Sequence, residues 1–206
     1  MEIVTKSIKL YLKEVIKKSA SKIGYSDLLK VEGITIDGKN DNGEKQLVSF
    51  GEVKLLKNLR YLEIRNILIT DYIIKILEDM DYLENIIFKN CTFRKTITTM
   101  NGLKPLRQIR IENCKNFNLK YINKVKIKSL TLKDLNISNI GNINNSVEIL
   151  DVSGSTITTN KNIDKLKISK IIVSHNDHIK YKRDFDKVKY EVVVMADEGY
   201  YIELGI

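Results

Sequence analysis

Apolar residues recur along this chain in a pattern typical of short strands. In the segment 59–69, two apolar residues one position apart, Leu62 and Ile64, follow another apolar residue, Leu59, three positions earlier. Alternation of apolar and variable residues has the period of a strand with one buried face. One strand of this length cannot shelter its apolar side, so the pattern predicts that it stacks against neighbouring strands.

The same pattern occurs six times in succession. The second apolar residue of each copy falls at Leu62, Ile86, Ile109, Leu130, Leu150 and Ile171. The steps between these positions are 24, 23, 21, 20 and 21 residues. A weaker copy on Val31, Ile34 and Ile36 precedes them. Such regular spacing predicts a solenoid of seven or eight coils, each adding one strand to a parallel sheet.

These copies resemble the leucine-rich repeat family, whose frame is LxxLxLxxN/CxL with a period of about 20–29 residues. The short period and the segment STITT at 155–159 are most similar to the bacterial, internalin-like branch. The resemblance covers about residues 31–180 and departs from the family at the Asn/Cys position. This chain has at that position Ile67, Cys91, Cys114, Leu135, Ser155 and Asn176. The resemblance implies an α/β solenoid with a curved parallel sheet and mostly irregular or short-helical convex returns.

The chain is expected to form a single domain with covered ends, because a terminal coil exposes an apolar face. Residues 1–30 are expected to form an N-terminal helical cap, residues 31–180 the repeats and residues 181–206 a C-terminal β cap. Within the first range, apolar residues of segment 5–22 fall at helical spacing and lysines line another face. A basic amphipathic helix could alternatively lie on an anionic membrane or bind a partner. Segment 190–204 predicts two strands around a turn.

The returns between strands differ along the chain. Segment 70–80 predicts a short helix with Thr70 as N-cap and Asp71 in the first turn. The later returns, around 139–145 and 159–165, are short and Asn-rich, which favours turns or single 3₁₀ turns. The polar segment 38–46 predicts an exposed loop.

Composition narrows the function classes. The 206 residues include 35 Lys and Arg against 26 Asp and Glu, a net charge of +9. No apolar run approaches the roughly 20 residues of a membrane span, and no secretory signal is recognisable at the N-terminus. The missing signal and the unpaired thiols together favour a cytoplasmic location; if a signal has been removed, the protein would be secreted. The excess charge makes nucleic acid or an anionic membrane an alternative partner, although the lysines are spread widely.

Cys91 and Cys114 occupy the same position in adjacent copies and are expected to point inward near one another. Two reduced structural thiols are the simplest interpretation. A disulfide between neighbouring coils and a catalytic thiolate remain as alternatives, the latter opposed by burial, which raises a thiol pKa. His175 and His178 form an i, i+3 pair with no helix expected beneath them, so we expect exposed or rim histidines.

No catalytic, metal-binding or cofactor-binding motif is found. We therefore expect a non-enzymatic module that needs no cofactor or metal and binds a protein through the concave face of its sheet. The electrostatic binder is one alternative, and a fragment of an enzyme or effector is another. The candidate partner-binding residues are Tyr61, Glu63, Arg65, Ile87, Lys89, Arg110, Glu112, Lys133, Asp151 and His175. Mixed charges suit a protein partner of patterned charge, with Tyr61, Ile87 and Ile172 as apolar anchors.

Overall fold

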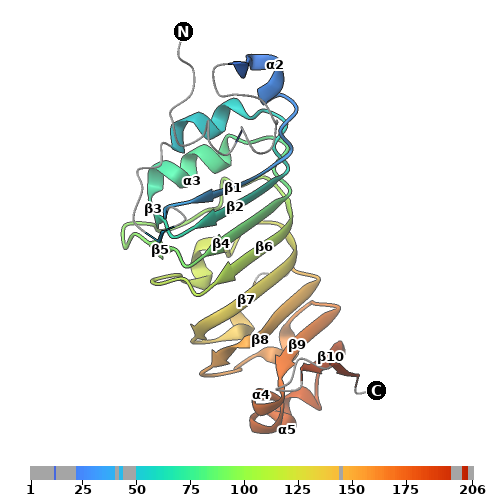
Figure 1. Cartoon of the computed structure of the whole chain (residues 1–206). Helices are drawn as coiled ribbons and strands as arrows, with labels where there is room; N and C mark the ends of the chain where they lie inside the picture. Colours follow the sequence, from blue (N-terminus) through green and yellow to red (C-terminus); the bar gives the residue numbers. More distant parts are fainter. Residues whose placement is uncertain are drawn as a thin grey trace.

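The protein is a stack of coils around one parallel sheet (Figure 1). This computed structural model describes residues 12, 22–39, 42–43, 50–143, 146–195 and 201–203. The parallel strands are β1 (Gly33–Asp37), β2 (Tyr61–Arg65), β4 (Asn85–Lys89), β6 (Leu106–Glu112), β7 (Ile127–Ile137), β8 (Ile149–Ile157), β9 (Lys170–Ser174) and β10 (Glu191–Met195). We number the coils 1–8 in this order, each coil being its strand and the chain up to the next strand. The predicted parallel solenoid is confirmed.

The LxL positions form the core of the solenoid. Each strand buries two residues separated by one, such as Leu62 and Ile64 in β2, which have no exposed surface. Neighbouring strands are in register, so Ile86 and Phe88 of β4 lie beside that pair. Burial of aliphatic and aromatic side chains from every coil therefore joins the coils into one continuous core.

Short helices and a small second sheet complete the coils. Near the N-terminal end lie α2 (Tyr25–Leu28) and η2 (Phe50–Leu55). Helix α3 (Asp71–Glu78) lies in coil 2, and Thr70 Oγ1 caps it by accepting a hydrogen bond from the backbone N–H of Ile73 at 3.4 Å. The predicted helix and its cap are confirmed. Strands β3 (Leu68–Ile69) and β5 (Thr92–Phe93) pair in parallel as the second sheet.

The later returns are single 3₁₀ turns. Turns η4 (Ile140–Asn142) and η5 (Ile163–Lys165) lie in the two Asn-rich segments that predict them, and η3 (Leu119–Ile122) is a further one. Helices α4 (His175–Lys180) and α5 (Lys182–Phe185) follow β9, and Figure 1 shows them at the end of the stack opposite α2.

The C-terminal segment forms the predicted strand pair. Strand β10 continues the parallel sheet, and β11 (Tyr201–Glu203) runs antiparallel to it. At the other end, the helix expected over residues 5–22 falls mainly outside the described residues. Of its apolar positions, Leu12 is described as helical and is fully buried. The expected loop at 38–46 also lies mostly outside the described residues.

Candidate functional site

The residues between the buried positions of the strands form three rows across the sheet. We call this surface, which is the face expected from the sequence to be concave, the outer face. Its first row is Gly33, Tyr61, Asn85, Gln108, Ser129, Ile149, Lys170 and Glu191. Its second row is Thr35, Glu63, Ile87, Arg110, Thr131, Asp151, Ile172 and Val193. Its third row, over coils 1–5, is Asp37, Arg65, Lys89, Glu112 and Lys133. Every predicted partner-binding residue except His175 therefore lies on the outer face.

The register changes between β7 and β8. Thr131 lies opposite Asp151, so uninterrupted pairing would place Lys133 opposite Ser153; it lies opposite Gly154 instead. Glycine suits this position because the contact is close. A Cβ atom at Gly154 would lie only 2.6 Å from the Cγ atom of Lys133, so the side chain of Lys133 occupies space that only glycine leaves open.

Glu63 is the centre of one polar cluster on the outer face. Its carboxylate accepts hydrogen bonds from Arg65 Nε at 2.7 Å and Tyr61 Oη at 3.3 Å, with Thr35 Oγ1 at 3.5 Å. The hydrogen bond with Glu63 raises the pKa of Arg65. Burial, and then the negative charge of Glu63, raise the pKa of Tyr61. Tyr61 therefore stays a neutral hydrogen-bond donor and Arg65 a cation at neutral pH.

Glu112 is the centre of a second cluster, which joins coils 3 and 4. Arg110 donates to Glu112 Oε2 from Nε at 3.0 Å and from Nη2 at 2.7 Å. Lys89 of the neighbouring strand reaches Oε1 at 2.7 Å. Burial alone would raise the pKa of Glu112, but the hydrogen bonds with Lys89 and Arg110 outweigh it, and the pKa is lowered. Glu112 is therefore a carboxylate held between two cations.

The acidic and basic side chains of the outer face differ in exposure. Glu63 and Glu112 retain only 8% and 9% of their accessible surface. The side chains of Arg65 and Arg110 remain 42% and 35% exposed. Lys133 is exposed too, and within the described part of the chain no carboxylate pairs with it. The basic groups therefore lie outermost.

The C-terminal half of the outer face carries fewer charges in its second row. Asp151 accepts hydrogen bonds from the backbone N–H and the hydroxyl of Ser153 at 3.0 and 2.7 Å. Ile172 of β9 lies beside Asp151 and is half-buried. Ile87, in the N-terminal half, is also half-buried and lies between Glu63 and Arg110.

A row of left-handed residues after the strands was not anticipated. Asn66, Asn90, Asn113 and Asp134 each follow a third-row residue and have φ values of 55°, 54°, 47° and 54°. Asn and Asp tolerate this backbone conformation better than other residues with side chains. Asn113 Nδ2 also donates to Asn90 Oδ1 at 2.8 Å, so the side chains link adjacent coils. The signal was in the sequence, as an Asn or Asp recurring directly after a charged residue.

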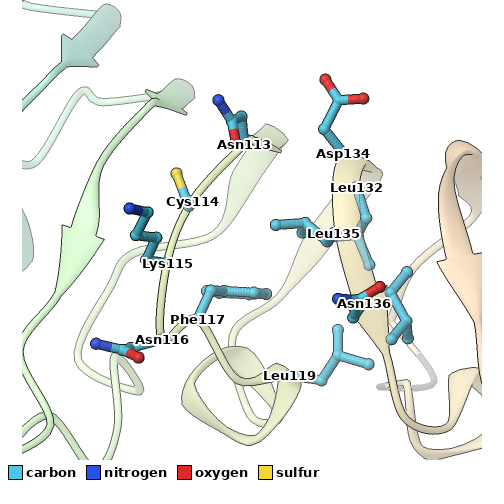
Figure 2. Close-up of a pocket in the computed structure, with 11 residues that line it drawn as sticks. Asn113, Cys114, Lys115, Asn116, Phe117, Leu119, Leu132, Asp134, Leu135 and Asn136 are labelled. Carbon is cyan, nitrogen blue, oxygen red and sulfur yellow. The ribbon is translucent and has the colours of Figure 1, made fainter.

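A pocket of about 430 Å³ opens behind the row of left-handed residues, between coils 4 and 5 (Figure 2). It is lined by Asn113, Cys114, Lys115, Asn116, Phe117, Leu119, Leu132, Asp134, Leu135, Asn136 and Ile137. In coil 4, Phe117 lies six positions after Ile111, whereas in coil 3, Phe93 lies five positions after Phe88. The extra residue, Asn116, has a φ of 58°. A one-residue insertion therefore accounts for the opening.

Both cysteines point into the core, as predicted, and neither forms a disulfide. Cys91 Sγ donates to the carbonyl of Ile64 at 3.3 Å, and Cys114 Sγ to that of Phe88 at 3.4 Å. The sulfur of Cys114 and burial both raise the pKa of Cys91. The sulfur of Cys91 in turn lowers the pKa of Cys114. Because both thiols are buried, the structural interpretation is favoured over a catalytic thiolate, which would need an accessible position.

The expectation of no helix beneath the histidines is wrong. His175 and His178 both lie in α4, which Ser174 caps by accepting from the backbone N–H of Asp177 at 3.1 Å. The S-x-x-D sequence at 174–177 is a helix-start signal that the repeat frame obscured. His175 is exposed beside the end of β9, whereas His178 stacks on Phe185. The helix also exposes Asn176, which the repeat frame places inward.

The described residues contain no group of three or more His, Cys, Asp or Glu side chains arranged to hold a metal ion. Among them there is also no helix with the length and hydropathy needed to cross a membrane.

The fold is a leucine-rich-repeat solenoid like that of an internalin. The crystal structure of an internalin (inlF) from Listeria monocytogenes is similar to this chain with a TM-score of 0.52 and 11% sequence identity. The similarity covers 92% of this chain and 64% of the internalin chain. No protein-family model matches the sequence, and no curated protein matches it. The likeness is therefore one of fold.

Proposed function

We propose that this chain is a non-catalytic interaction module that binds a protein partner through the outer face. The observation that carries the proposal is the register of the sheet. Backbone pairing holds Glu63, Ile87 and Arg110 side by side on successive strands. Side chains fixed on such a stiff surface lose little conformational entropy on docking, which favours binding.

The resemblance to leucine-rich repeat proteins supports the same function, because such proteins usually bind other proteins through this face. The assignment to the bacterial, internalin-like branch is part of the proposal. So is the absence of turnover. A cytoplasmic location, expected from the unpaired thiols, stays a prediction.

The outer face has a composition suited to protein recognition. Tyr61 and Ile87 offer half-buried apolar surface next to charged groups, the combination found where a few residues supply most of the binding energy. The cations Arg65, Lys89 and Arg110 are each paired with a glutamate. This pairing is why we prefer a protein partner to the electrostatic alternative of nucleic acid or an anionic membrane.

Site-specific crosslinking tests the proposal. A photoreactive phenylalanine at Ile87 should crosslink a protein from an extract of the source organism, whereas the same group at Lys75, which is exposed on α3, should not. The captured protein is then purified and its affinity measured. Replacing Ile87→Asp should weaken binding by at least tenfold, because a central apolar contact is lost and a charge is buried. The matched control is Leu68→Asp, at an exposed apolar residue of β3. Equal effects of the two variants would refute binding through the outer face.

A further inference from the structure

Charge on the outer face is concentrated over the strands β2, β4, β6 and β7. The cations there are Arg65, Lys89, Arg110 and Lys133, and the carboxylates are Glu63 and Glu112. Four positive charges against two negative charges leave an excess of two. We call these six residues the basic patch.

The excess is turned toward solvent. Glu112 is shared between Lys89 and Arg110, so one negative charge serves two cations. Lys133 has no carboxylate partner within the described residues. Because both glutamates are buried beneath the longer basic side chains, an approaching group meets the cations first.

The basic patch is short and has acidic ends. Asp37 lies on β1 next to Arg65, and Asp151 lies on β8 next to Thr131. Three strand steps separate β2 from β7, which is about 14–15 Å at the usual strand spacing. A long polyanion or a flat anionic membrane would extend over these acidic ends and be repelled by them. A short anionic segment would not.

We propose that the outer face recognises a short, extended, acidic segment of its protein partner. This inference rests on the proposed function and adds the chemistry of the partner. In an extended chain, residues i and i+4 lie on one side about 13–14 Å apart. Two carboxylates at that spacing reach Arg65 and Lys133, the third-row cations at the two ends of the basic patch. Apolar side chains nearby in the segment would contact Tyr61 and Ile87.

Fluorescence anisotropy with labelled peptides tests the proposal. The probe is a fluorescein-labelled peptide of about ten residues, built of Ser and Thr with Glu at positions i and i+4. One comparison peptide carries the two Glu residues side by side, and another replaces both with Gln. At low salt, where exposed charges are weakly screened, the i, i+4 peptide should bind at least threefold more tightly than either comparison peptide.

Charge-matched variants locate the interaction. Arg65→Gln combined with Lys133→Gln should weaken binding of the i, i+4 peptide about fivefold, as expected for two largely exposed ion pairs. The control is Lys75→Gln with Lys95→Gln, which removes the same charge from exposed positions outside the outer face. Its binding should match that of the wild type. Replacing Arg65 breaks its ion pair with Glu63 and could disturb the face. Lys133→Gln alone breaks no ion pair among the described residues, and it should also weaken binding of the i, i+4 peptide.

Three results would overturn the proposal. One is equal binding of the acidic and Gln peptides, and another is equal weakening by both pairs of variants. The third is tighter binding of a single-stranded oligonucleotide or of phosphatidylserine vesicles than of the peptide, lost in the Arg65 and Lys133 variants. Failure of the proposed function is distinguishable. If the captured partner binds the double variant normally but not Ile87→Asp, the outer face remains a protein site and only its acidic specificity is refuted.

Discussion

The junction between coils 3 and 4 and the junction between coils 4 and 5 are built from similar sequences but are joined differently. At the first, Lys115 N–H donates to the carbonyl of Cys91 at 2.9 Å, and Phe93 N–H donates to that of Lys115 at 2.9 Å. At the second junction, the last backbone hydrogen bond along the chain is donated by the Asn113 N–H to the carbonyl of Lys133 at 2.9 Å. Among the described residues, no backbone hydrogen bond joins 114–117 to 134–137.

The difference shows how much one residue matters in a solenoid. Coils 2, 3, 5 and 6 each place an apolar residue five positions after the second residue of the buried pair: Ile69, Phe93, Ile137 and Ile157. Coil 4 needs six positions to reach Phe117 because Asn116 is inserted. The backbone then turns away at Asn116, and pairing resumes only between coils 5 and 6, at Asn136 and Thr156. Pairing of the strands themselves tolerates the insertion, whereas pairing after the strands does not.

The largest effect is expected in the aromatic cluster of the closed junction. Phe93 is fully buried and contacts Phe88 and Phe117, with ring centroids 5.3 Å apart in both cases. Replacing Phe93→Ala should lower the free energy of unfolding by about 3–5 kcal/mol. Phe117→Ala should cost about 1–3 kcal/mol, since this half-buried ring lines the pocket. Urea unfolding measures both. Equal losses would mean that the two junctions are packed equally well.

A smaller loss is expected where pairing resumes. Ser155 Oγ donates to the carbonyl of Leu132 at 2.9 Å and accepts from the backbone N–H of Leu135 at 3.1 Å. Replacing Ser155→Ala removes both hydrogen bonds between coils 5 and 6 and should cost about 1–3 kcal/mol. The control is Ser153→Ala, whose half-buried hydroxyl donates to Asp151 of the same strand and does not join two coils. It should cost less than Ser155→Ala. If urea unfolding shows a neutral Ser155→Ala variant, this side chain does not hold coils 5 and 6 together.

Deleting Asn116 should convert the open junction into a closed one. The deletion places Phe117 five positions after Ile111, so Cys114, Lys115 and Phe117 can pair with segment 134–137 as coils 3 and 4 do. One or two new backbone bonds should raise stability by about 1 kcal/mol. Hydrogen exchange gives the sharper measurement, since the amides of Asn136 and Phe117, the counterparts of Lys115 and Phe93 at the closed junction, should exchange more slowly than in the wild type. Replacing Asn116→Ala keeps the insertion and should not slow them. Unchanged exchange in the deletion variant would show that the insertion is not the cause of the opening.

The smallest effect concerns the outer face, where Glu112 pairs back to Lys89 of coil 3 and not forward to Lys133 of coil 5. The pKa of Glu112 is lowered in the folded protein. This carboxylate therefore stabilises the fold above its unfolded pKa, and the contribution is lost as the pH falls through the folded value. Urea unfolding at neutral and acidic pH should show a weaker pH dependence for Glu112→Gln and Lys89→Gln than for the wild type. Lys133→Gln should retain the dependence of the wild type, and a reduced one would place Lys133 in the cluster.

Much of the scaffold could be predicted because the signals are local and repeated. The L-x-L pattern fixes which side of each strand is buried, so it also identifies the residues of the outer face. Thr70 marks the start of α3 for the same reason, since an N-cap is a property of a few adjacent residues. The row containing Asn66 and Asn90 was equally local, but it lies next to the family's Asn/Cys position and was overlooked.

The arrangement of charges could not be predicted from the repeat. Spacing places Glu63 near Arg65 and Glu112 near Arg110, yet it does not say that the carboxylates lie beneath the cations. That depends on side-chain conformations and on neighbours from other coils, such as Thr35 and Lys89. The shift that pairs Lys133 with Gly154 is likewise a matter of packing between strands. Helix α4 could not be predicted from the repeat pattern, because the pattern runs on through residues 174–177, which form a helix cap.

The insertion at Asn116 also has a mechanical consequence. Coils 4 and 5 are connected through β6 and β7, whereas the segments behind those strands are separated by the pocket. At this joint the angle between the two halves of the solenoid can change without breaking a backbone hydrogen bond behind the strands. The curvature of the sheet, and with it the span from Tyr61 to Ile172, is therefore less constrained there than at the junction of coils 3 and 4.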